Sequence, residues 1–389
     1  MPISCWYGLP VWDNIRAMIA GANPALPMKR RQFLAGAAAV AIAARPRVAA
    51  FAQIPGPASR PGGGAVKAFC VDFNWGPKGA SPPGMYAQAD PAEHVRWYRD
   101  LGANTIQTFC VSYNGYAWYP SEVAPITPDL KARDFLGDMV RLGHQAGMKV
   151  MGYFTLGANP CWEGRHQALV HGDDSDYIKI PMTLEYLDYF CRSVEDALKK
   201  TGVDGFMVDW VRPTQHKRWL PCEQEMYRQI MGEAFPKSGD PSADVALRFD
   251  KLAMERAWRH IRWAVRGTRP VVVWTNHPIV KTEYPLWEGH RLLKEVDWVL
   301  NEAPELEHLE WLSRQVGPQT LIVQNLCGWE GHDATAWKKI DAKRFGLYGF
   351  AKADEKTTLP DPAVGGNGRN IEIIREAYHR LDGPGKGGT

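Results

Sequence analysis

Gly205-Phe206-Met207-Val208-Asp209-Trp210 is the segment of the chain most informative about its fold. Its apolar residues run on without polar alternation, which is typical of a strand buried on both faces. Thr201-Gly202-Val203 comes just before it, and Gly is the preferred residue immediately past the end of a helix. The stretch therefore predicts a strand of a parallel sheet that is entered from a helix and ends in a carboxylate.

The same unit, an apolar run followed by an amphipathic helical pattern, recurs along the chain. The predicted strands are Val66–Trp75, Thr105–Val111, Lys149–Thr155, Gly205–Trp210, Val271–Thr275, Trp298–Glu302, Thr320–Asn325 and Gly346–Ala351. Eight β/α units predict a single-domain (β/α)8 TIM barrel in the α/β class. A doubly wound open sheet is the alternative, but it requires a Gly-rich phosphate loop after the first strand. Phe73-Asn74-Trp75-Gly76-Pro77 is not such a loop.

Helix starts are marked by capping residues followed by proline. Asp90-Pro91-Ala92-Glu93 combines an N-cap, a proline at the first helical position and a glutamate in the first turn. Thr127-Pro128-Asp129 repeats the cap and the proline, so we expect a second helix to begin there. A long helical pattern covers Ala243–Arg266.

The composition excludes several classes of protein. The chain has 389 residues, of which 45% are hydrophobic and 23% charged, so it is neither disordered nor collagen-like. A net charge of +3 gives no electrostatic signature of a nucleic-acid binder. The seven cysteines form no C-x-x-C or zinc spacing, so we predict no metal and no cofactor.

The N-terminal region reads as an export signal followed by a linker. Met28-Lys29-Arg30-Arg31 opens a basic segment, an uncharged Ala-rich run follows from Leu34 to Ala44, and Ala50-Phe51-Ala52 resembles a cleavage site. The Arg pair with Phe33-Leu34 resembles the twin-arginine signal. We therefore expect an upstream extension in residues 1–27, a signal in 28–52, a flexible lead-in in 53–65 and the barrel in 66–389. Translation starting at Met28 is the expectation for the initiator.

The carboxyl ends of the strands carry the chemistry in a TIM barrel. Asp209 leaves a buried strand at that end, where a charge is costly unless it is paired or used. Glu302 holds the matching place on the sixth predicted strand. Glycoside hydrolysis needs two carboxyl groups that flank one bond, so we predict Asp209 as nucleophile and Glu302 as acid/base. Glu305, Glu163 and Asp72 compete with Glu302 for the second role. Asp209 pairing structurally with Arg212 or Lys352 is the other interpretation.

Aromatic and amide side chains lie beside these carboxylates. The chain has 16 Trp and 14 Tyr, and an aromatic face with planar hydrogen-bonding groups suits the binding of a sugar. The predicted substrate-binding residues are Asp72, Trp75, Asn114, Trp118, Trp162, Trp210, Arg212, Asn276, His277, Asn325, Trp329 and Lys352. Trp residues that only cap the core beneath the loops are the structural alternative. Arg212 and Lys352 are placed to bind an anionic substituent such as a sulfate or a uronate.

The stretch 205–210 resembles the strand-four nucleophile segment of glycoside hydrolase family 29, the retaining α-L-fucosidases, and of related α-galactosidase-type barrels. Asn114-Gly115-Tyr116-Ala117-Trp118 resembles the strand-two segment that reads His-His-Asp-Gly-Phe, then Trp, in those fucosidases. Ser112 and Tyr113 stand where that family has its His pair. The resemblance implies an Asp nucleophile at Asp209, an acid/base from a later loop or strand, and a divergent glycosidase.

These features predict an exported bacterial glycoside hydrolase, periplasmic or extracellular, that acts on a poly- or oligosaccharide. We predict a carbohydrate partner, no nucleic acid, and no membrane span in the mature form. The alternatives are a carbohydrate-binding barrel without catalysis and a metal-dependent polysaccharide deacetylase. The sugar, the linkage and the oligomeric state are left open by the sequence.

Overall fold

The computed structural model describes residues 65–76, 79–128, 130–131, 133–172, 178–214, 219–275, 281–302, 306–326, 344–361 and 371–381. Within these ranges, eight parallel strands form a closed barrel in the order β1-β10-β9-β8-β7-β6-β5-β4. Closure is explicit, because β1 pairs with β4 on one side and with β10 on the other. The predicted TIM barrel is therefore confirmed, and the open doubly wound sheet is excluded.

The barrel strands match the eight predicted runs, and four of them end one to three residues earlier than expected. They are β1 (Lys67–Asp72), β4 (Thr105–Phe109), β5 (Lys149–Thr155), β6 (Gly205–Asp209), β7 (Val271–Thr275), β8 (Trp298–Asn301), β9 (Leu321–Asn325) and β10 (Gly346–Lys352). The last residues of the first predicted strand instead form a small antiparallel hairpin, β2 (Trp75–Gly76) with β3 (Gly79–Ala80).

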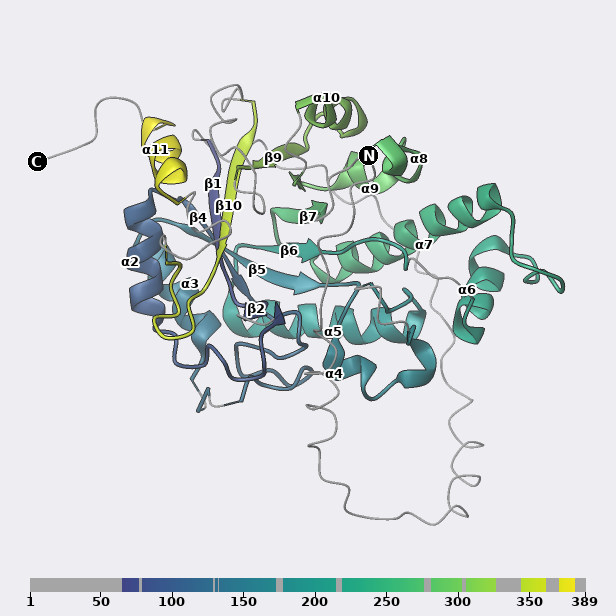
Figure 1. Cartoon of the computed structure of the whole chain (residues 1–389), viewed down its shortest axis with the longest axis horizontal. Helices are drawn as coiled ribbons and strands as arrows, with labels where there is room; N and C mark the ends of the chain where they lie inside the picture. The colour runs from purple at the N-terminus through teal and green to yellow at the C-terminus, as the bar shows by residue number, and fades with distance from the viewer. Residues whose placement is uncertain are drawn as a thin grey trace, which may run out of the picture. The chain divides into compact units, whose positions relative to one another are not determined.

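Helices lie around the outside of the strands (Figure 1). They are α2 (Pro91–Leu101), α3 (Phe135–Gln145), α4 (Pro160–Glu163), α5 (Leu184–Thr201), α6 (Pro221–Met231), α7 (Ala243–Ala264), α8 (Tyr284–Trp287), α9 (Arg291–Glu295), α10 (Leu306–Gln315) and α11 (Ile371–Leu381). Two short 3₁₀ turns, η1 (Gln167–Leu169) and η2 (Lys281–Glu283), complete the set. No helix in the described ranges has the length and apolarity to cross a membrane.

Capping explains where the first helices begin. The Asp90 side chain accepts a hydrogen bond from the Ala92 amide, and Pro91 occupies the first turn of α2, as predicted. The start predicted at Thr127-Pro128 is wrong. The Thr127 hydroxyl donates to the Ala117 carbonyl, and α3 begins later behind Asp134, whose side chain accepts from the Gly137 amide.

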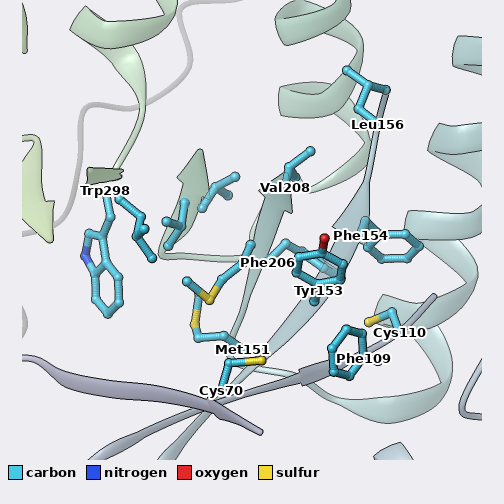
Figure 2. Close-up of a cluster of buried hydrophobic side chains, with 14 of the residues drawn as sticks. Cys70, Phe109, Cys110, Met151, Tyr153, Phe154, Leu156, Phe206, Val208 and Trp298 are labelled. Atoms are coloured by element: carbon cyan, nitrogen blue, oxygen red, sulfur yellow. The ribbon is translucent and has the colours of Figure 1, made fainter. Parts of the chain in front are cut away.

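The register separates an inner from an outer face of the barrel. Val150 and Ile106 lie against Gly143 of α3, and Phe154 packs on Phe190 of α5, so these residues face outward. Residues of opposite parity therefore face the barrel axis. Figure 2 shows both sets in the buried core, with inward Cys70, Phe109, Met151 and Tyr153 and outward Phe154, Phe206 and Val208.

Candidate active site

Several strands end in an inward-facing polar residue, and these residues line the mouth of the barrel, the end at which the strands finish. Asp209 on β6 is in register with Thr155 on β5, and Asp72 on β1 is in register with Lys352 on β10. Asp72 and Asp209 are only 4% and 5% exposed. Two carboxyl groups are thus held inside the mouth, where little water solvates them.

Asp209 accepts a hydrogen bond on each of its carboxyl oxygens. The Trp210 amide donates to Oδ1 at 2.8 Å, and the Tyr153 hydroxyl donates to Oδ2 at 2.5 Å. Donors on both oxygens suit a carboxylate, because an ionised carboxyl group is an acceptor only. The two donors therefore fix the orientation of the side chain and favour its charged form.

Burial dominates the proton affinity of both carboxyl groups. It raises the pKa of Asp209 to about 8, against the lowering effect of the Tyr153 and Trp210 donors, and the charge of Asp72 adds to the rise. Burial also raises the pKa of Asp72 to about 6, while the Asn74 amide and the charge of Lys352 oppose it. The two groups therefore titrate near neutral pH, as functional carboxyl groups often do.

Tyr153 connects Asp209 to the end of β1. Its hydroxyl accepts from the Asn74 side-chain amide at 3.2 Å and lies 2.9 Å from the Thr155 hydroxyl. The orientation of the Asn74 side chain is set, because its Oδ1 accepts from the Tyr113 amide at 2.8 Å. Asn74, Tyr153 and Thr155 thus form a polar network between the two carboxyl groups.

An aromatic wall stands beside this network. Trp75 and Tyr113 stack with ring centroids 5.6 Å apart, and Tyr113 meets Trp210 edge-on at 5.3 Å. Trp210 has a positive φ of 53°, a backbone conformation that is uncommon for a bulky residue and tends to occur at functional sites. Trp75 is half-buried, so part of its surface remains open to a ligand.

Glu302 and Asn325 lie on the opposite side of the mouth. Glu302 directly follows β8 and continues the inward parity of Trp298 and Leu300, and it is 8% exposed. Asn325 ends β9 on the inner face, in register with Tyr348. The residues directly before these two also contact each other, because the side-chain amide of Asn301 donates to the side-chain oxygen of Gln324 at 2.8 Å. The structure therefore offers Asp72 and Glu302 as possible partners for Asp209.

Three polar residues predicted to bind the substrate, Arg212, Lys352 and Asn114, lie in different environments. Arg212 is buried and forms an ion pair with Glu283 of η2. Its partner is therefore Glu283 and not Asp209, which was the structural alternative. Lys352 is exposed at the end of β10, where its charge acts on Asp72. Asn114 holds a turn, accepting from the Ser112 hydroxyl at 2.7 Å and the Tyr116 amide at 3.2 Å.

Two of the predicted sugar platforms are buried in the core instead. Trp118 packs against Phe73 and Phe135 and donates to the Ser112 hydroxyl, and it is 3% exposed. Trp162, also 3% exposed, stacks on His166 at 4.0 Å and packs on Tyr186. Both rings are covered by neighbouring side chains, which corrects their expected role in stacking on a sugar.

Glu163 serves the backbone at the start of a short helix. Its Oε1 accepts from the Asn159 amide at 2.9 Å, while the Asn159 side chain accepts from the Trp162 amide. This reciprocal arrangement at the N-terminus of α4 resembles a capping box, with the glutamate one position later than in the standard motif. It gives Glu163 a structural role and leaves Asp72 and Glu302 as the described competitors for the second carboxyl role.

Several predicted features lie outside the described residues. They are Asn276, His277, Trp329, the competing Glu305 and the export signal in residues 28–52. Within the described ranges there is no group of three or more His, Cys, Asp or Glu side chains that suits a metal ion. The five described cysteines, Cys70, Cys110, Cys161, Cys191 and Cys222, form no disulfide bonds.

Sequence reasoning missed Tyr153 and Asn74, the two side chains that organise Asp209. The available signal was the parity of β5. Met151, Tyr153 and Thr155 share the inward face of a predicted strand, and a tyrosine near the carboxyl end of that face brings a hydroxyl to the mouth.

A closed (β/α)8 barrel with buried carboxyl groups at its mouth defines the class of TIM-barrel proteins whose site has the components of a glycosidase. Residues 90–210 match the family model described as hypothetical glycosyl hydrolase 6, and this range contains Tyr153 and Asp209. No curated protein matches the chain.

Solved structures show the same fold. The α-L-fucosidase isoenzyme 2 from Paenibacillus thiaminolyticus aligns with a TM-score of 0.61 at 17% identity, over 82% of this chain and 49% of that one. The PgaB (BpsB) glycoside hydrolase domain from Bordetella bronchiseptica aligns with a TM-score of 0.51 at 12% identity, over 81% of this chain and 98% of that one. The chain thus spans about half the length of the fucosidase. The predicted resemblance to TIM-barrel glycoside hydrolases is confirmed by the family match over residues 90–210, and the solved structures share the barrel fold.

Proposed function

We propose that this protein is an exported glycoside hydrolase that cleaves a glycosidic bond in a poly- or oligosaccharide, with Asp209 as the nucleophile of a retaining mechanism. The observation that carries this proposal is the state of Asp209. It is buried at the carboxyl end of β6, faces the barrel axis and holds a hydrogen bond on each oxygen. An oriented, poorly solvated carboxylate is suited to attack an anomeric carbon or to stabilise positive charge there.

The walls of the site fit a sugar as the substrate. The half-buried Trp75, backed by Tyr113, offers an aromatic face next to the carboxyl groups. Sugar C–H groups stack on such a face, while carboxylate and amide groups take the hydroxyls. The family match over residues 90–210 and the fold shared with an α-L-fucosidase support the same class of substrate. An α-L-fucoside is the first candidate.

The test is a screen of the purified protein on nitrophenyl glycosides and on algal and plant polysaccharides, with Asp209→Asn in parallel. We expect the wild type to release nitrophenol or new reducing ends from at least one substrate. Asp209→Asn should lower that turnover by at least about 100-fold, the low end of the contribution of a positioned catalytic group. Binding on a glycan array without product from any substrate would instead support a carbohydrate-binding barrel. Full turnover by the variant would remove Asp209 from the mechanism.

A further inference from the structure

Asp72 is an inward-facing carboxyl group whose hydrogen bonds differ from those of Asp209. It ends β1, in register with Lys352, and 96% of its surface is removed from solvent. Its Oδ1 accepts from the Asn74 amide at 2.7 Å. Among the described residues, no hydrogen bond reaches Oδ2. One oxygen is therefore anchored, and the other is available to exchange a proton with a ligand.

The contrast with Asp209 indicates a division of roles. Both oxygens of Asp209 already accept hydrogen bonds from protein donors, which stabilise its ionised form. A group that donates a proton to a leaving oxygen needs an oxygen free of such donors, with room for a hydrogen between it and the substrate. In this site Asp72 Oδ2 meets that requirement.

Asn74 holds the two carboxyl groups in a fixed relation. Its backbone amide donates to Asp72, and its side-chain amide donates to Tyr153, which in turn donates to Asp209. The charge of Asp72 also contributes to the raised pKa of Asp209. With pKa values of about 6 for Asp72 and about 8 for Asp209, the two groups together carry one proton between these pH values. Because Asp209 has the higher pKa, it holds that proton most of the time. Acid-assisted attack by a carboxylate proceeds from the other arrangement of the same proton, with Asp72 protonated and Asp209 charged.

We propose that Asp72 is the second catalytic residue of this site, the acid/base, in place of Glu302. This inference rests on the proposed glycosidase function. Asp72 Oδ2 gives its proton to the glycosidic oxygen as the bond from that oxygen to the anomeric carbon breaks. The electron pair of the broken bond stays on the departing oxygen, and an oxygen of Asp209 bonds to the carbon. In the second half, Asp72 takes a proton from water, the water oxygen bonds to the carbon, and Asp209 leaves as a carboxylate.

Leaving groups of different acidity test this role. Using the glycone that the screen identifies, kcat/KM is measured for the phenyl, 4-nitrophenyl and 2,4-dinitrophenyl glycosides. Asp72→Asn should lose at least about 100-fold on the phenyl glycoside and less than about 10-fold on the dinitrophenyl glycoside, because dinitrophenolate departs without protonation. Asp209→Asn should lose activity on all three substrates.

Glu302→Gln is the competing variant. If Glu302→Gln shows the dependence on leaving group and Asp72→Asn loses equally on all three substrates, Asp72 is a ligand of sugar hydroxyls and the proposal is overturned. Activity of the wild type that does not depend on Asp209 would contradict the proposed function itself, so the two failures are distinguishable.

A second arm needs no substrate. The Tm of Asp72→Asn, Asp209→Asn and the double variant is measured at pH 8.5, where both carboxyl groups of the wild type are charged. Because each single substitution relieves the same repulsion, the double variant should gain less than the sum of the two single gains. Asp250→Asn is the matched control, a carboxyl group on α7 whose pKa burial raises to about 7. Its effect should add to that of Asp209→Asn. Additive effects for Asp72 and Asp209 would also overturn the proposal.

Discussion

Asp209 illustrates how a single residue is costly to the fold and useful to the site. The folded chain binds its proton far more tightly than the unfolded chain, because burial raises the pKa from the ordinary 3.8 to about 8. As the pH rises from about 4 to about 8, the unfolded chain releases this proton while the folded chain keeps it. The contribution of Asp209 to stability therefore falls across this range and levels off above it.

Asp209→Asn should consequently stabilise the protein in a pH-dependent way. At pH 5 the Tm of the variant should exceed that of the wild type by little. At pH 8.5 the excess should be at least about 2 °C, the effect of roughly 1 kcal/mol in a large domain. Differential scanning calorimetry across pH 4–9 measures this difference. A constant difference across the range would show that Asp209 is not held with a raised pKa.

Tyr153→Phe should act through the same carboxyl group. Removing the hydroxyl takes one of the two donors from Asp209, so the pKa of Asp209 should rise further. We expect kcat/KM near neutral pH to fall about 10- to 100-fold, since a hydrogen bond to a charged group contributes about 1.5–3 kcal/mol. The upper limb of the pH–rate profile should move to higher pH.

Tyr119→Phe is the matched control for that substitution. Tyr119 is equally buried, and its hydroxyl donates to Asp196 on α5, outside the mouth of the barrel. This variant should lose some stability and keep the pH–rate profile of the wild type. If the upper limb of the pH–rate profile does not move in Tyr153→Phe, Tyr153 does not affect the pKa of Asp209.

Among the elements, β6 shows what the sequence predicts and what it does not. Its apolar run and terminal Asp209 predicted the strand and the carboxyl group at the mouth, because buried parallel strands are apolar throughout and their ends are functional. The contacts across the mouth could not be predicted, since Asn74 and Tyr153 come from β1 and β5 and meet Asp209 only after the barrel closes. These contacts therefore cannot be read from the sequence around any one of the three residues.

The tryptophans at the ends of strands show the same limit of prediction from the sequence. Trp75, Trp118 and Trp162 follow their strands in the same manner along the sequence, but only Trp75 remains partly open. Whether a ring faces solvent depends on which segments pack against it, as Phe73 after β1 and Phe135 of α3 do against Trp118. Spacing alone does not distinguish a platform from a core residue.

Close packing of the start of β6 against Pro270, which directly precedes β7, and against β5 predicts a strong effect of Gly205→Ala. A Cβ at Gly205 would lie 2.0 Å from the Pro270 carbonyl oxygen and 2.7 Å from Met151 Cε. Because the first neighbour is backbone, we expect a loss of about 1–3 kcal/mol or more in the free energy of unfolding. Gly172→Ala is the control, with no atom within 4 Å of its Cβ, and should change the free energy by less than about 0.5 kcal/mol. Urea denaturation compares them, and equal stabilities would contradict the packing described for β6.

At the scale of the whole molecule, we predict that the region before the barrel directs export of the protein. Met28-Lys29-Arg30-Arg31 and the following Ala-rich run resemble a twin-arginine signal. Expressed in a bacterium with a twin-arginine pathway, the wild type should reach the periplasm or the medium. Replacing Arg30 and Arg31 together by Lys should keep it in the cytoplasm. Equal fractionation of both forms would argue against this export route.

Rescue of Asp209→Gly by azide shows whether Asp209 engages the anomeric carbon. On the dinitrophenyl glycoside of the glycone found in the screen, this variant should be nearly inactive alone. Azide should restore turnover and yield a glycosyl azide, identified by NMR, with the anomeric configuration opposite to that of the substrate. Wild-type turnover by Asp209→Gly without azide would show that Asp209 does not bond to the anomeric carbon.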